Sequence, residues 1–137
     1  MSVDHGTALH AALIAHLGAD AGIRATLGEP ARIWDSVPNQ AAHPYLLIER
    51  SQSRAVPADG CGVEHQLTLR AVSTFGGVPE AQGVVAAVRE ALAEAVLEAD
   101  GVRTVSVRVA FADVFRSRDL RRTWAVIRVR AVTEERD

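Results

Sequence analysis

The chain has 137 residues and a mass of 14.6 kDa, which is the size of one ordinary domain with a core of its own. Hydrophobic residues make up 48% of the sequence but aromatic residues only 4%, so the core is expected to be aliphatic, and the formal charge of −2 argues against nucleic-acid binding through bulk electrostatic attraction. The sequence shows neither an apolar run of membrane-spanning length nor a signal peptide, so we expect neither membrane insertion nor secretion.

Two helices are predicted first. Apolar residues recur at helical spacing over residues 7–17, with Thr7 as the N-cap and Gly18 as the stop. A shorter helix is expected to begin after Asp20 and to end at Gly28. The first helix presents one apolar face, which predicts that it packs against another layer.

Strand signals follow, at Ile33–Trp34, at residues 45–51 and at Val63–Thr74. Residues 52–62 contain a proline and two glycines and are expected to form a loop. In the third strand polar and apolar residues alternate, so one side is predicted to be buried. His65 lies on the apolar side and is expected to be a hydrogen-bonded core residue.

The clearest helix is predicted over residues 79–98, with valines and leucines on one face. Glu90, Glu94 and Glu98 share the opposite face, and we interpret them as its solvated side rather than as a cation site.

Two more strands are predicted, over residues 102–115 and 123–133, joined by the arginine-rich link 116–122. In the first of them, alternation predicts that Val105 and Phe111 lie on the buried side, together with Val107 and Val109.

These elements predict an α+β fold, in which a mostly antiparallel sheet of about five strands carries one long and one or two short helices packed on one face. Neither a repeat nor a linker divides the sequence. We therefore expect a single domain over residues 1–137, with frayed ends at about 1–6 and 134–137.

Metal and catalytic sites receive little support. His5, His10 and His16 are five and six residues apart, whereas ligands on one helix face are three or four apart, and the single cysteine, Cys61, has no second thiol. No metal, cofactor or catalytic residue is expected. A hydrolase would need a pocket that holds His65 or His43 beside an acid.

The polar sides of the strands carry arginines that share one parity, which predicts an arginine-bearing sheet face. Its residues are Arg70, Arg108, Arg128 and Arg130. One interpretation is a solvated surface whose charge is balanced by Glu49 and Glu64. The other is a face that meets a neighbouring subunit or a polyanion, for which guanidinium groups are suited.

Three segments in a fixed order resemble a known family. They are the two opening helices that end at Gly28, the stretch IWDSVPNQAAHPYLLI, and EHQLTLRAVSTFGG before a long helix, closed by the strand WAVIRVRAVTE. Over about residues 9–133 the chain resembles the tail-completion or tail-terminator proteins of long-tailed bacteriophages and of gene transfer agents.

The resemblance implies a structural assembly protein that caps the tail tube as a ring, ends tube growth and joins the tail to the head connector. The implied partners are copies of itself in a hexamer, the tail-tube protein and the head–tail connector, with DNA passing through the lumen without specific binding. It implies no enzyme activity, cofactor or membrane. The protein would be in the bacterial cytoplasm during assembly, and then at the head–tail junction of the particle.

Interface residues are expected in two polar connections, because loops are where adaptable contacts usually lie. The candidates are Arg54 and Asp59 in the loop 53–62, and, in and beside the link 116–122, Asp113, Arg116, Arg118, Asp119, Arg121 and Arg122. For any single residue the alternative is a solvated loop charge. The alternative function is a small polyanion- or ligand-binding module that uses the arginine-bearing face.

Overall fold

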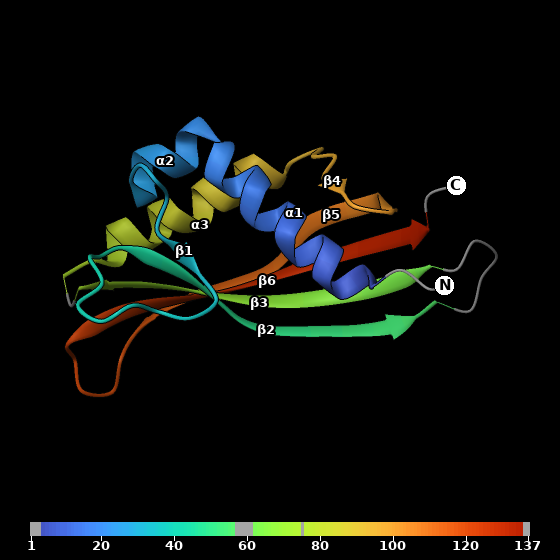
Figure 1. The fold of residues 1–137 in the computed structure, drawn as a ribbon. Helices are drawn as coiled ribbons and strands as arrows, with labels where there is room; N and C mark the ends of the chain where they lie inside the picture. The colour runs from blue at the N-terminus through green and yellow to red at the C-terminus, as the bar shows by residue number, and fades with distance from the viewer. Residues whose placement is uncertain (1–3, 57–61, 75, 136–137) are drawn as a thin grey trace.

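A computed structural model describes residues 4–56, 62–74 and 76–135 of the chain. In these ranges three helices lie on one face of a six-stranded sheet, and the opposite face carries no helix (Figure 1). The helices are α1 (His5–Ala19), α2 (Ala21–Leu27) and α3 (Val78–Leu92). The strands are β1 (Ile33–Trp34), β2 (Tyr45–Ala55), β3 (Val63–Thr74), β4 (Glu98–Ala99), β5 (Val102–Arg116) and β6 (Arg122–Glu135).

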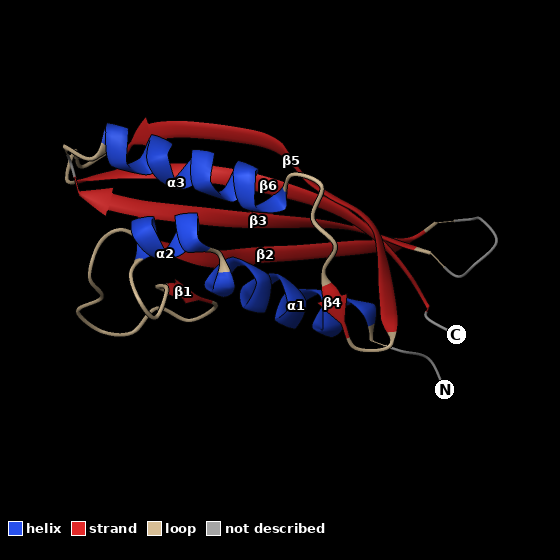
Figure 2. Ribbon diagram, turned by 90° about the horizontal axis from the view of Figure 1, so that it is seen from above, coloured by secondary structure: helices blue, strands red, loops and turns tan. Residues whose placement is uncertain are grey.

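The sheet has the order β1-β2-β3-β6-β5-β4, so the last strand of the chain lies inside it. Among the described strands, β1 and β2 pair in parallel and the other neighbouring pairs are antiparallel. Seen from the helix side, α1 and α3 lie across the sheet, with β4 beside α1 (Figure 2). The predicted α+β class is confirmed, and the additional strand is the two-residue β4. No helix in the described ranges is long and apolar enough to cross a bilayer.

The N-terminal helix begins earlier than its sequence pattern predicts. Its N-cap is Asp4 rather than Thr7, because the backbone N–H of Thr7 donates to Asp4 Oδ1 at 3.0 Å. This bond and one from the Thr7 hydroxyl lower the pKa of Asp4. Gly18 lies inside α1 and does not end it, whereas Asp20 caps α2 as predicted, accepting from Ile23 N–H at 3.0 Å. At the other end of the chain, β6 continues to Glu135, past the expected start of the frayed end.

One aliphatic core lies between the helices and the sheet. Every fourth residue of α1 points into it, and Leu9, Leu13 and Leu17 are fully buried there. The alternation predicted for β3 is confirmed, because its apolar side is buried and its polar side faces away from the helices. The same cluster also contains Leu67, Leu69, Val84, Val88, Ile127 and Val129.

The third helix ends six residues before the predicted end. At Glu94 the backbone turns with φ of 55°, which carries Leu97 into the core and leaves Val96 72% exposed. The Leu97 N–H donates to Thr104 Oγ1 at 3.2 Å, which holds the chain beside β5. Glu90, Glu94 and Glu98 therefore do not form the predicted helical ridge, because burial of Leu97 and pairing of β4 outweigh continuation of the helix.

Two β-bulges change the inward side of β5. Thr104 pairs with Thr133 but Ser106 pairs with Val132, so the intervening Val105 is the inserted residue. A second shift occurs between Val109 and Phe111. The prediction that Val105 and Phe111 are buried is wrong, since they are 55% and 46% exposed.

Gly77, directly before α3, gives a stability prediction. An alanine Cβ at this position would lie 2.8 Å from Ser73 Cβ and 3.0 Å from the Thr74 carbonyl oxygen. Ser73 is fully buried and its hydroxyl donates to Glu80, so it has little room to move. We expect Gly77→Ala to lower the free energy of unfolding by about 1–3 kcal/mol, measured by urea denaturation.

The matched control is Gly83→Ala, in the exposed interior of α3, where an added Cβ meets nothing within 4 Å. Alanine has the higher helix propensity, so the free energy of unfolding is expected to rise by about 0.5–1 kcal/mol. If both substitutions raised the free energy of unfolding, the close contact at Gly77 would not be rigid.

Candidate functional site

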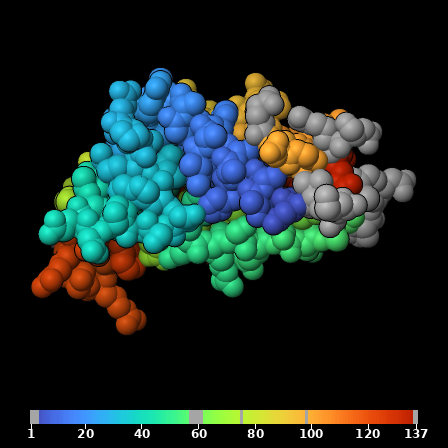
Figure 3. Space-filling model, viewed as in Figure 1, coloured from blue at the N-terminus to red at the C-terminus, as the bar shows by residue number. Residues whose placement is uncertain are grey.

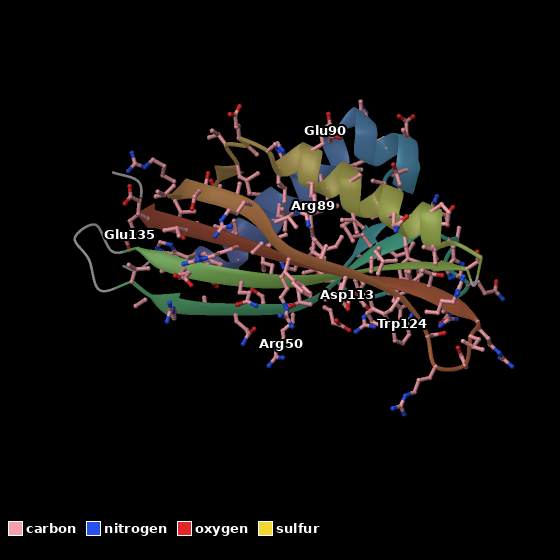
Figure 4. All side chains as sticks on the ribbon, turned by 180° about the vertical axis from the view of Figure 1, so that it is seen from behind. Arg50, Arg89, Glu90, Asp113, Trp124 and Glu135 are labelled. Carbon is pink, nitrogen blue, oxygen red and sulfur yellow. The ribbon has the colours of Figure 1, made fainter. Side chains whose placement is uncertain are left out.

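The helix-free face of the sheet carries the four arginines predicted to lie together. In an antiparallel pair, directly opposed residues share a face, and Arg108 opposes Arg130 while Thr68 opposes Arg128. Arg70 lies on the same face, opposite Val126. Figure 4 shows Arg50 projecting from the side of the sheet opposite to that of Glu90 on α3.

Much of the positive charge on this face is paired. Arg130 Nη2 lies 3.0 Å from Glu64 Oε2, and Arg54 Nη2 lies 3.4 Å from Glu64 Oε1. The hydrogen bond from Arg130 is the main reason that the pKa of Glu64 is lowered. Arg70 Nε pairs with Glu49 Oε1 at 3.0 Å. These contacts correspond to the balanced surface, the first of the two interpretations of the sequence.

Aromatic residues interleave with the arginines toward the β5–β6 end of this face. The Arg70 guanidinium lies 4.5 Å from the centre of the Trp124 ring, and Arg128 lies 5.2 Å from that of Phe111. Phe115 packs edge-on against Trp124 at 6.0 Å between centroids. The alternation in the sequence predicts Phe111 on the buried side because it contains no signal for the bulge, whereas Trp124 is recognisable as an aromatic residue at a polar position of its strand. Aromatic and arginine side chains are enriched in protein interfaces.

The connection from β5 to β6 is a tightly held turn. The Ser117 hydroxyl donates to Asp119 Oδ1 at 2.5 Å, and the Arg121 N–H donates to the same oxygen at 3.1 Å. These bonds, that from Ser117 first, lower the pKa of Asp119. Asp119 therefore orders the turn. Leu120 adopts φ of 57° and is 61% exposed, an unusual conformation for a branched apolar residue.

The candidate residues of the link are distributed around this turn. Asp113 and Arg116 belong to β5 and Arg122 begins β6, so only Arg118, Asp119 and Arg121 lie in the turn itself. In the space-filling view the orange-red turn projects beyond the body of the molecule (Figure 3).

The second group of candidates lies at the other end of the sheet. Arg54 belongs to the end of β2, not to a loop, and Asp59 is outside the described residues. The end of β2 and the start of β3 lie at one end of the sheet in Figure 1, and the β5–β6 turn lies at the other. Since Val63–Thr74 spans most of the sheet, the two groups are separated by roughly 35 Å at about 3.3 Å per residue. The structure does not bring them together.

The histidines do not converge on a metal or catalytic centre. His5 Nδ1 and His65 Nε2 lie 2.7 Å and 2.8 Å from the Thr133 hydroxyl oxygen, whereas His16 Nε2 lies 2.7 Å from the Ala91 carbonyl oxygen. His10 Nε2 is 3.5 Å from an oxygen of Asp35. Within the described ranges, no three metal-binding side chains cluster.

A recess of about 420 Å³ includes His65 and Glu64 in its lining. As neighbours on one strand they point to opposite faces: His65 is buried in the core, and Glu64 is held by Arg130 and Arg54 on the helix-free face. They are not placed to act as an acid–base pair. Burial is the main cause that lowers the pKa of His65, which favours the neutral ring.

Comparison with known proteins identifies matches that cover nearly the whole fold. A family model described as "Tail completion protein gp17" matches residues 11–134. No curated protein matches the sequence. Among solved structures, the chain is similar to one in the "Virion of native gene transfer agent (GTA) particle", with a TM-score of 0.86 and 25% sequence identity over 97% of this chain and 99% of that one. The family resemblance read from the sequence is confirmed.

Proposed function

The chain belongs to the family described as Tail completion protein gp17, and from this premise we propose that it closes the tail tube of a phage-like particle as a ring of identical subunits. The ring ends tube growth and offers its outer surface to the head connector. The observation that carries the proposal is the match to a chain of a gene transfer agent virion over 97% of this fold.

The shape of the subunit supports this role. A subunit in a closed ring contacts its two neighbours through different surfaces, and a ring between tube and connector has two further faces to cover. The long sheet presents exposed polar groups at both of its ends, Arg54 at one and the turn with Arg118 and Arg121 at the other. One molecule of this size can therefore reach several partners, which are the tube protein, the connector and copies of itself, in a hexamer.

The proposed role needs no catalysis and no cofactor. Subunits are made in the bacterial cytoplasm and end at the head–tail junction, where DNA passes through the lumen without specific binding. The alternative, a monomeric polyanion-binding module, is weakened because Arg70 and Arg130 already pair with Glu49 and Glu64. Such a module would bind a polyanion with an affinity that falls steeply with salt.

Deletion of the gene tests the proposal. We expect the released particles, imaged by electron microscopy, to have tails longer than normal and without heads, because tube growth continues and no joining surface forms. The intact gene supplied in trans should restore normal length and attachment. Tails of normal length joined to heads would refute the proposed role and direct attention to polyanion binding by the helix-free face.

A further inference from the structure

The exposed apolar residues of the molecule are concentrated on one element. Among the described residues, six large hydrophobic side chains are exposed, and four of them, Val105, Phe111, Phe115 and Leu120, lie on β5 or in the turn that follows it. Exposed apolar groups that gather in this way mark interaction surfaces. The most exposed of these four is Leu120, which lies in the projecting turn in a left-handed conformation, beside the hydrogen bonds that Asp119 accepts.

The surroundings of Leu120 indicate the charge of its partner. Residues 116–122, here called the basic turn, contain four arginines and one aspartate. The aspartate is occupied by Ser117 and by the Arg121 backbone, whereas Arg118 and Arg121 are exposed. The tip therefore offers an apolar side chain between two guanidinium groups, which fits an apolar contact bordered by carboxylates.

This chain carries such a surface itself. Val96 is the most exposed of the six apolar residues, at 72%. It lies in residues 90–100, here called the acidic turn, which contain four carboxylates and no basic residue. Of these carboxylates, Glu90, Glu94 and Asp100 are exposed.

The two surfaces lie at opposite corners of the molecule. In Figure 1 the basic turn is at one end of the sheet, on the side away from the helices, and the link from α3 to β4 lies above the sheet toward the other end. Figure 4, from behind, shows Glu90 on the helix side and the turn on the opposite side. They cannot meet within one molecule, but separate, complementary surfaces are what a head-to-tail interface requires.

We propose that the basic turn of one copy docks on the acidic turn of the next, with Leu120 against Val96 and with Arg118 and Arg121 against Glu90 and Glu94. The partner is a second copy of this chain. The inference rests on the proposed ring and adds the contact that closes it. Repeated around the ring, the same contact uses both surfaces of every subunit.

Charge reversal tests the contact in the purified chain. Arg118→Glu with Arg121→Glu, and separately Glu90→Arg with Glu94→Arg, are each expected to weaken self-association by about tenfold or more in sedimentation equilibrium, because like charges then oppose each other. The fourfold variant should restore association. An equimolar mixture of the two double variants should also restore it, because each chain then matches the other at both surfaces and alternation closes an even-numbered ring. Circular dichroism checks that every variant is folded.

Cross-linking tests the same contact in assembled particles. In a Cys61→Ser background, Leu120→Cys combined with Val96→Cys should give a ladder of oxidised oligomers, whereas Leu120→Cys combined with Val37→Cys, an exposed position outside both turns, should not. Three results would overturn the contact. The first is unchanged association after either reversal, and the second is a weakening that neither the fourfold variant nor the mixture rescues. The third is particles that give no ladder. These outcomes are separate from that of the gene deletion. If the deletion gives overlong, headless tails but the cysteine variants give no ladder, the proposed function stands and only the interface is refuted.

Discussion

Replacement of Leu13 by alanine is expected to lower the free energy of unfolding by about 3–5 kcal/mol. Leu13 is fully buried on α1, in the one core that joins the helices to the sheet. The truncated side chain removes apolar burial and leaves a cavity, since the packed neighbours on the helices and the sheet cannot all move inward. The loss is a large part of the stability of a domain of this size. Urea denaturation followed by circular dichroism measures it.

The same substitution at Leu120 is the control. Leu120 is 61% exposed in the β5–β6 turn, so Leu120→Ala should change the free energy of unfolding by no more than about 0.5 kcal/mol. If the two variants were equally stable, the packing of α1 on the sheet would be wrong. Leu120→Ala should also weaken association between copies without lowering the free energy of unfolding. It therefore distinguishes a leucine that contacts another copy from one that stabilises the core.

Replacement of Thr133 by valine is the second large effect, and we expect a loss of about 2–4 kcal/mol. The fully buried Thr133 hydroxyl bonds both His5 Nδ1 at 2.7 Å and His65 Nε2 at 2.8 Å, which joins α1 and β3 to β6. Valine has almost the same shape but leaves two buried ring nitrogens without this partner, and each unsatisfied group costs about 1–3 kcal/mol. Thr68→Val, on the helix-free face of β3, is the matched control and should stay within about 0.5 kcal/mol.

The pH dependence of stability gives a second measurement on this cluster. Burial, with the charge of His5 as a smaller cause, lowers the pKa of His65 below its usual 6.5. As the pH falls through 6.5, His65 binds a proton in the unfolded chain but stays neutral in the folded chain. The free energy of unfolding therefore decreases as the pH falls, by at most about 1.4 kcal/mol per pH unit. His65→Gln should make the decline between pH 7 and pH 5 shallower. An unchanged slope would show that His65 does not cause it.

The helix-free face and the two turns differ in how their exposed groups are paired. The paired arginines around Glu64 form a balanced surface, whereas the apolar tips at Leu120 and Val96 have no apolar cover in the described part of the monomer. Charge alone did not separate these cases in the sequence, because arginines occur on both surfaces, at Arg130 and at Arg118. The exposure of large apolar side chains distinguishes the turns from the balanced surface, because burial of apolar surface favours association.

The class of the fold and the family can both be recognised in the sequence. Alternation in β3 and helical spacing in α1 are local patterns that follow from the geometry of each element, and they are sufficient to assign His65 and the apolar face of α1 to the core. Asp20 as the cap of α2 was equally local, because its carboxylate bonds a backbone N–H three residues away.

The positions at which these patterns stop depend on tertiary packing. Two bulges turned Phe111 outward, and the burial of Leu97 ended α3 early and exposed Val96, because strand register and core packing depend on residues far apart in the chain. The same is true of the candidate interfaces: Arg54 and Arg118 lie in similar polar connections in the sequence, but strand order places them at opposite ends of the sheet. A short stretch of sequence does not specify which distant strands pair with each other. This pairing positions the surfaces on which assembly depends.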